Sequence, residues 1–253
     1  MTLEFSTYFL LAGVGILAGF IDSIAGGGGL LTVPALLSIG LPPASALATN
    51  KLQSSFGSFS AAFYFIRRGY VDLKQIRNAI IFTFIGSAIG TLSVQQIDPS
   101  ALKQVIPFML IGFALYFLFS PNIGDQDRQQ RMSFQRLSFF VGLGVGFYDG
   151  FFGPGTGSFF AIAFVALAGF NLSKATAHSK VLNFTSNFAA LIFFILGGKM
   201  VWTVGIAMGC GQFVGARLGS RMVVAKGSKI IRPLLVTMSL VMSARLLWQH
   251  YSG

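Results

Sequence analysis

The sequence predicts an all-α polytopic membrane protein, and its composition is the first reason. Hydrophobic residues make up 54% of its 253 residues and charged residues only 10%, and the mean hydropathy is +0.73. Such a chain has too little polar surface for a soluble globule. Its apolar runs are long and lack the period-two alternation of outer-membrane barrel strands, so we expect helices as the spanning form.

The lengths of the apolar runs are the second reason, because a membrane span needs roughly 17 to 25 residues. We expect eight full spans, near residues 6–24, 44–66, 76–95, 101–120, 134–151, 174–197, 200–220 and 230–249. Two shorter apolar pieces, near 30–40 and 157–170, each follow a glycine-rich break. The prediction is therefore ten helical pieces, two of them too short to cross alone.

The net charge of +11 is concentrated in three short connections between spans. Their basic residues are Arg67, Arg68, Lys74 and Arg77, then Arg128, Arg131 and Arg136, and finally Arg221, Lys226, Lys229 and Arg232. Short cytoplasmic loops collect such residues. All three connections reach the cytoplasmic side only if 6–40 and 134–170 each enter and return as a re-entrant hairpin. We expect that topology in a bacterial inner membrane, with both termini periplasmic and no nucleic-acid partner.

A duplicated motif is the third reason for the predicted class. Gly19-Phe20-Ile21-Asp22 precedes the block Gly26 to Gly29, and Gly146-Phe147-Tyr148-Asp149 precedes Gly153-Pro154-Gly155-Thr156-Gly157. In each half a lysine follows about thirty residues later, Lys51 or Lys180. We expect two repeats, 1–120 and 134–253, joined by a polar cytoplasmic linker at 121–133 into one transmembrane domain. The charge pattern makes the repeats inverted, with a site expected at the midplane between them.

The glycine blocks are candidate substrate contacts. Backbone that is not helical survives in a bilayer only when it is buried in protein or lines a wet cavity. The free N–H groups there and the positive end of the following short helix would hold an anion. The candidates are Gly26, Gly27, Gly28, Gly29, Gly153, Gly155 and Gly157. Close helix packing is the competing interpretation, and for Gly86, Gly90, Gly205, Gly209, Gly211, Gly215 and Gly219 it is the favoured one.

Ionisable side chains at bilayer depth need a partner or a function, because each costs roughly 2.5 to 3.5 kcal/mol on insertion scales. Asp22 and Asp149 are candidates for proton coupling, and Lys51 and Lys180 for attracting an anion. Two structural Asp–Lys pairs are the alternative. Further candidates for substrate contact are Asn50, Gln53, Ser179 and Asn183, which lie on polar helix stripes that interhelical hydrogen bonding would also explain. His178 is either a proton relay or a structural histidine.

The two glycine motifs, together with Ala48-Thr49-Asn50-Lys51, closely resemble the TauE/SafE family of sulfite exporters and related permeases, over essentially the whole chain. The resemblance implies transport of small sulfur-containing or organic anions, of the sulfite, sulfonate and sulfoacetate class. The second block is Gly-Pro-Gly-Thr-Gly rather than four glycines, so we expect the two half-sites to differ.

The sequence thus favours a secondary transporter, proton-coupled and alternating its access around a midplane site. We expect no enzymatic activity, cofactor or metal; the partners expected are a small anion and the lipid bilayer, with a homo-oligomer left open. A passive channel, an accessory subunit and an intramembrane aspartyl protease are the alternatives. The single cysteine, Cys210, excludes an intrachain disulfide.

Overall fold

A computed structural model describes residues 4–98, 100, 126–127, 129–227 and 229–230. The predicted span near 101–120, and all but the first residue of that near 230–249, lie outside this part. The described chain is helical and contains no strand, which confirms the all-α class. Its helices are α1 (Phe5–Ala25), α2 (Gly29–Ser38), α3 (Pro43–Arg67), α4 (Arg77–Gln95), α6 (Phe134–Leu137), the π-helical η1 (Ser138–Gly142), α7 (Leu143–Phe151), α8 (Thr156–Ala168), α9 (Leu172–Leu196) and α10 (Trp202–Lys226).

Three of the described helices, α1, α4 and α9, are long and apolar enough to cross a membrane. The helices α3 and α10 have 25 residues each, but they carry more polar side chains. At 1.5 Å per residue such helices are roughly 37 Å long, which exceeds the hydrocarbon thickness of about 30 Å. The lengths of these helices therefore match a polytopic membrane protein.

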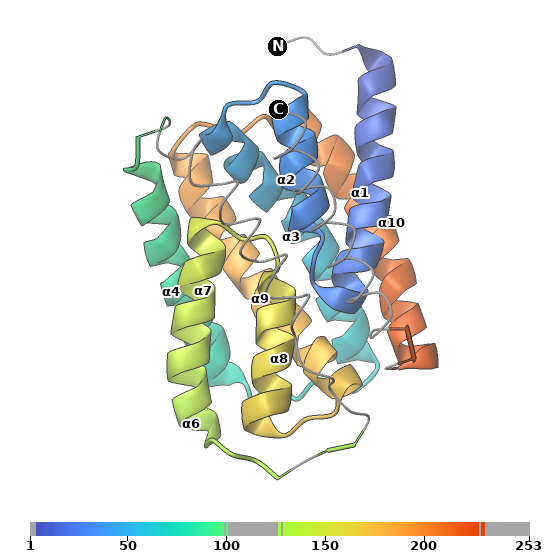
Figure 1. Cartoon of the computed structure of the whole chain (residues 1–253), viewed down its shortest axis with the longest axis vertical. Helices are drawn as coiled ribbons and strands as arrows, with labels where there is room; N and C mark the ends of the chain where they lie inside the picture. The colour runs from blue at the N-terminus through green and yellow to red at the C-terminus, as the bar shows by residue number, and fades with distance from the viewer. Residues whose placement is uncertain (1–3, 99, 101–125, 128, 228, 231–253) are drawn as a thin grey trace, which may run out of the picture.

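The helices break at both predicted glycine blocks. Gly26 adopts a left-handed conformation with φ 82°, and its N–H donates to the Asp22 carbonyl at 2.7 Å, which ends α1. Gly155, with φ 85°, immediately precedes α8. In Figure 1, α1 descends and α2 returns upward, whereas α6, η1 and α7 ascend and α8 returns downward. The two hairpins thus enter from opposite ends of the molecule, and their tips lie near its middle.

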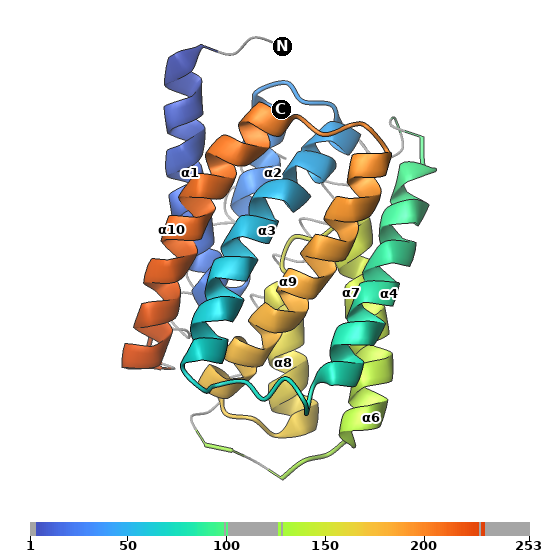
Figure 2. The same cartoon turned by 180° about the vertical axis from the view of Figure 1, so that it is seen from behind.

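The helices group into two bundles that do not coincide with the two halves of the sequence. We call α1, α2, α3 and α10 the first bundle, and α4, α6, η1, α7, α8 and α9 the second. The last described helix of each half, α4 or α10, packs against the hairpin and central helix of the other half. The bundles meet where α3 lies beside α9, in the centre of Figure 2, and at the hairpin tips.

Glycines allow the exchanged helices to pack closely. A Cβ built at Gly215 of α10 would lie 1.9 Å from the Ile16 carbonyl oxygen of α1. One built at Gly90 of α4 would lie 2.1 Å from the Phe147 carbonyl oxygen of α7. No side chain fits at such distances, so the packing role predicted for these glycines is confirmed.

The basic connections lie toward one end of the molecule. Figure 1 shows the α3–α4 connection, the segment 129–133 before α6 and the C-terminal end of α10 all in its lower part. This is the arrangement that the hairpin topology requires. That this end faces the cytoplasm stays a prediction.

Candidate functional site

The tips of the two hairpins touch each other in the middle of the molecule. A Cβ built at Gly26 would lie 2.2 Å from the backbone nitrogen of Ser158, and one at Gly29 would lie 2.9 Å from the Pro154 Cα. The Ser158 hydroxyl also donates a hydrogen bond to the Ala25 carbonyl. Glycine is therefore needed at this contact both for the backbone conformation of residue 26 and for the lack of space.

The first of two ion pairs in the described part of the chain is buried and joins Lys51 of α3 to Asp149 of α7. The Lys51 Nζ lies 2.7 Å from Asp149 Oδ1, and both side chains are 1% exposed. The Asp149 carboxylate also accepts hydrogen bonds from the hydroxyls of Thr156, at 2.8 Å, and Ser186. This carboxylate is therefore surrounded by donors, as a buried charge requires.

The second pair joins Lys180 of α9 to Asp22 of α1, and it is looser. The Lys180 Nζ lies 3.3 Å from Asp22 Oδ2, and the Asp22 side chain is 16% exposed. Asp22 also accepts from the Gly28 N–H at 3.1 Å and, at the limit of hydrogen-bond distance, from the Asn183 amide at 3.5 Å. The two half-sites are therefore unequal in their geometry.

Both lysines bind the end of a broken helix as well as a carboxylate. Lys51 donates to the backbone carbonyl of Asp149, and Lys180 to that of Asp22. These carbonyls lie in the last turn before each break, where the helix dipole is negative. Each pair also connects the first bundle to the second, so the two lysines link the bundles on either side of the hairpin tips.

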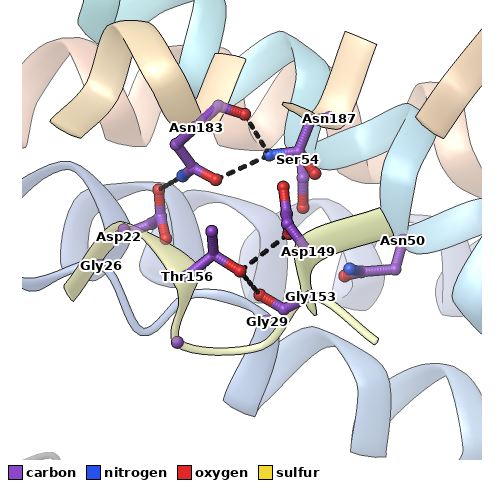
Figure 3. A pocket seen from close by; sticks show the side chains of 12 residues that line it. Asp22, Gly26, Gly29, Asn50, Ser54, Asp149, Gly153, Thr156, Asn183 and Asn187 are labelled. Carbon is purple, nitrogen blue, oxygen red and sulfur yellow. Dashed lines mark hydrogen bonds between the residues drawn. The ribbon is translucent and has the colours of Figure 1, made fainter. Parts of the chain in front are cut away.

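A polar pocket lies between the hairpin tips and the central helices (Figure 3). Its empty space, including the part open at its mouth, is about 270 Å³, and the room inside for the centre of a water-sized sphere is about 10 Å³. That is enough for about one water molecule. The lining residues are Asp22, Gly26, Gly29, Asn50, Ser54, Asp149, Gly153, Gly155, Thr156, Gly157, Asn183 and Asn187.

One amide presents a donor to this pocket. The Asn50 Oδ1 accepts from Thr32 Oγ1 at 2.6 Å and from Gln53 Nε2 at 2.7 Å. Asn50 is 2% exposed, and the hydrogen bonds found for its side chain among the described residues are both to Oδ1 rather than Nδ2. Figure 3 shows the end of the Asn50 side chain directed toward the pocket. An N–H₂ group on the lining of the pocket is placed to donate to a bound anion.

The family model described as sulfite exporter TauE/SafE matches residues 11–246. The chain belongs to the TauE/SafE family. A relative from Escherichia coli K12, named probable membrane transporter protein YfcA, is 56% identical over 94% of this chain and 88% of its own length. A probable membrane transporter protein of Haemophilus influenzae is 52% identical over 94% and 95%. No solved structure matches.

Membership of the TauE/SafE family makes the protein a membrane transporter, and the structure places most of the predicted site residues around one pocket. Those that line it are Asp22, Gly26, Gly29, Asn50, Asp149, Gly153, Gly155, Gly157 and Asn183. The predicted residues Gly27, Gly28, Lys51, Gln53, Ser179 and Lys180 do not line it. The lysines lie behind the aspartates, and the Ser179 hydroxyl donates to the Thr176 carbonyl within α9. Sequence reasoning missed Thr32, because it stands alone in an apolar helix.

His178 lies apart from the pocket of this TauE/SafE protein. Its Nδ1 lies 2.8 Å from the Lys174 carbonyl, and its ring packs beside Phe164 and Phe170, with centroids 5.5 and 4.8 Å away. Its Nε2 is buried without a partner among the described residues. These contacts belong to the α8–α9 end of the second bundle and give the histidine no direct access to the hairpin tips.

Proposed function

We propose that the protein is a secondary transporter of small sulfur-containing or organic anions, of the sulfite, sulfonate and sulfoacetate class. The observation that carries the proposal is the polar pocket between two touching hairpin tips, flanked by ion pairs that join the two bundles. The substrate class comes from the TauE/SafE family, and the pocket supplies groups suited to a small anion.

The donors around the pocket support an anionic substrate. The helices α2 and α8 both begin there, so their positive ends point toward it. The N–H groups of Gly29 and Gly157 have no recorded acceptor among the described residues. Together with the Asn50 amide, they offer hydrogen bonds to an oxyanion on several sides of the pocket.

The two bundles are the bodies that we expect to move during transport. The repeats are inverted in this proposal, so rocking one bundle against the other opens the pocket first to one side and then to the other. The α3–α4 and α9–α10 connections join the bundles in the described chain, and each contains a left-handed glycine in open space, Gly69 with φ 73° and Gly198 with φ 65°. The pocket has room for about one water, so a polyatomic anion requires it to widen.

Reconstitution into liposomes tests the proposal. Purified protein should bind and accumulate at least one of sulfite, methanesulfonate, sulfoacetate and thiosulfate, and an imposed proton gradient should drive this uptake. The Lys180→Ala variant should weaken binding, because it removes a cation beside the pocket. Absence of binding and flux for all four anions in the wild type would contradict the proposed substrate class.

The alternatives make different predictions in the same experiment. A passive channel would move the anion only down its own gradient, with no response to an imposed pH difference. A protease would need two carboxylates that share a proton at close range. Here Asp22 and Asp149 are each paired with a different lysine, which favours the transporter.

A further inference from the structure

The two ion pairs differ in how firmly their carboxylates are held. Asp149 is 1% exposed and has three side-chain donors, Lys51 at 2.7 Å, Thr156 at 2.8 Å and Ser186. Asp22 is 16% exposed, lies 3.3 Å from its lysine and opens onto the pocket. A buried pair can separate only if each charge finds a new partner, and among these four residues Asp22 is the one placed to exchange partners.

The groups that donate hydrogen bonds to Asp22 are of the kinds that bind oxyanions in proteins. They are the N–H of Gly28 just before α2, the ammonium of Lys180 and the amide of Asn183. The Asn50 amide faces the same pocket from the opposite side (Figure 3). The carboxylate of Asp22 thus occupies a place where a small oxyanion would make the same contacts.

We propose that Asp22 is a built-in occupant of the anion site, and that a proton taken up by Asp22 releases Lys180 and Asn183 to the substrate. This inference rests on the proposed function and names the residue that couples substrate to protons. The exchange balances: the proton binds a carboxylate oxygen of Asp22, the Asp22–Lys180 ion pair breaks, and the entering monoanion replaces the lost negative charge. The pocket then keeps its net charge, which lowers the cost of burial.

The other ionisable groups near Asp22 are few. Lys180 comes from α9, and across the pocket lie Asp149 from α7 and its partner Lys51 from α3. The helices α2 and α8 contain no titratable residue. Those of α10 are Cys210, Arg217, Arg221 and Lys226, and none has a recorded contact with Asp22. Asp22 is therefore the pocket carboxylate whose charge can change without breaking the Lys51–Asp149 pair.

Equilibrium binding of labelled methanesulfonate to purified protein tests this. A sulfonate stays ionised between about pH 5 and pH 8, so any pH dependence belongs to the protein. Wild-type affinity should fall as pH rises, by up to about tenfold per pH unit, because binding is coupled to the uptake of one proton. In weakly buffered solution, binding should take up about one proton per anion, and this measurement needs no variant.

The Asp22→Asn variant mimics the protonated carboxylate. It should bind methanesulfonate with an affinity independent of pH and without proton uptake, whereas the matched control Asp72→Asn, in the exposed α3–α4 connection, should behave as wild type. Wild-type binding without proton uptake, or an unchanged pH dependence in Asp22→Asn, would overturn the inference and leave anion transport standing. No binding of methanesulfonate or sulfoacetate by the wild type at any pH would contradict the proposed function itself.

Discussion

At the scale of single residues, the protein keeps two lysines and two aspartates inside an apolar molecule by pairing them across its two bundles. Lys51 and Lys180 are each 1% exposed, and each also binds a carbonyl at the end of a broken helix. An isolated charge would cost several kcal/mol there. The pairs therefore hold the bundles together as well as neutralising the site.

Removing one member of the tighter pair should be severely destabilising. Lys51→Met leaves Asp149 buried without its cation, and we expect a loss of about 3 to 5 kcal/mol. Thermal unfolding in detergent measures the change. The double variant Lys51→Met with Asp149→Asn removes both charges, so it should recover part of the loss. A double variant less stable than the single one would show that the ion pair is not the source of the effect.

The glycine at the tip of the first hairpin should not tolerate a side chain. Gly26→Ala places a methyl group 2.2 Å from the Ser158 nitrogen and forces alanine into φ 82°. The strain alone costs about 1 to 3 kcal/mol, so folded yield and anion binding should both fall. Gly13→Ala, inside α1, is the control, since nothing lies within 4 Å of its added methyl group. Equal behaviour of the two variants would refute the tip contact.

At the scale of the elements, the sequence was informative where glycine and charge interrupt apolar runs. It predicted both helix breaks, the pocket-lining glycines and the packing glycines, because these follow from local backbone freedom and lack of side chain. It could not predict that Asp22 pairs with Lys180 and Asp149 with Lys51, since that depends on how α3 and α9 cross. Nor could it find Thr32, whose hydroxyl meets Asn50 only after α2 folds back beside α3.

Close packing of α10 on α1 provides a test at this scale. Gly215→Ala would put a methyl group 1.9 Å from the Ile16 carbonyl oxygen, so α10 must move away. We expect a lower melting temperature and reduced transport. Gly144→Ala on α7 has open space, and it should be neutral or stabilise by up to about 1 kcal/mol through helix propensity. A Gly215→Ala protein as stable as wild type would contradict the close approach of these helices.

At the scale of the whole molecule, the last described helix of each half packs in the bundle formed mainly by the other half. The sequence repeats meet at the linker 121–133. The packing of α4 and α10, however, gives two bundles that each contain helices from both halves. Periodicity cannot reveal this exchange, because it concerns contacts between distant helices. The site lies where the two bundles meet, which is where relative motion would alter it most.

Cross-linking tests whether the two bundles move relative to each other during transport. In a Cys210→Ser background, cysteines replacing Phe59 of α3 and Phe184 of α9 join the two bundles, because these rings lie 5.4 Å apart. A short thiol cross-linker there should stop transport, and reduction should restore it. Cysteines replacing Tyr8 and Thr203, whose hydroxyls lie 3.3 Å apart within the first bundle, are the control and should leave transport intact after cross-linking. Transport that survives the first cross-link would show that α3 and α9 do not move apart.

The transport mechanism requires the anion to bind between the hairpin tips. Crystals grown with 2-bromoethanesulfonate would locate the sulfonate by the anomalous scattering of its bromine. We predict the sulfonate between the starts of α2 and α8, within hydrogen-bond distance of Asn50 and Lys180, with the Asp22 carboxylate turned away. A bromine found only at the basic connections or in lipid-facing grooves, with the hairpin tips still in contact, would contradict the account.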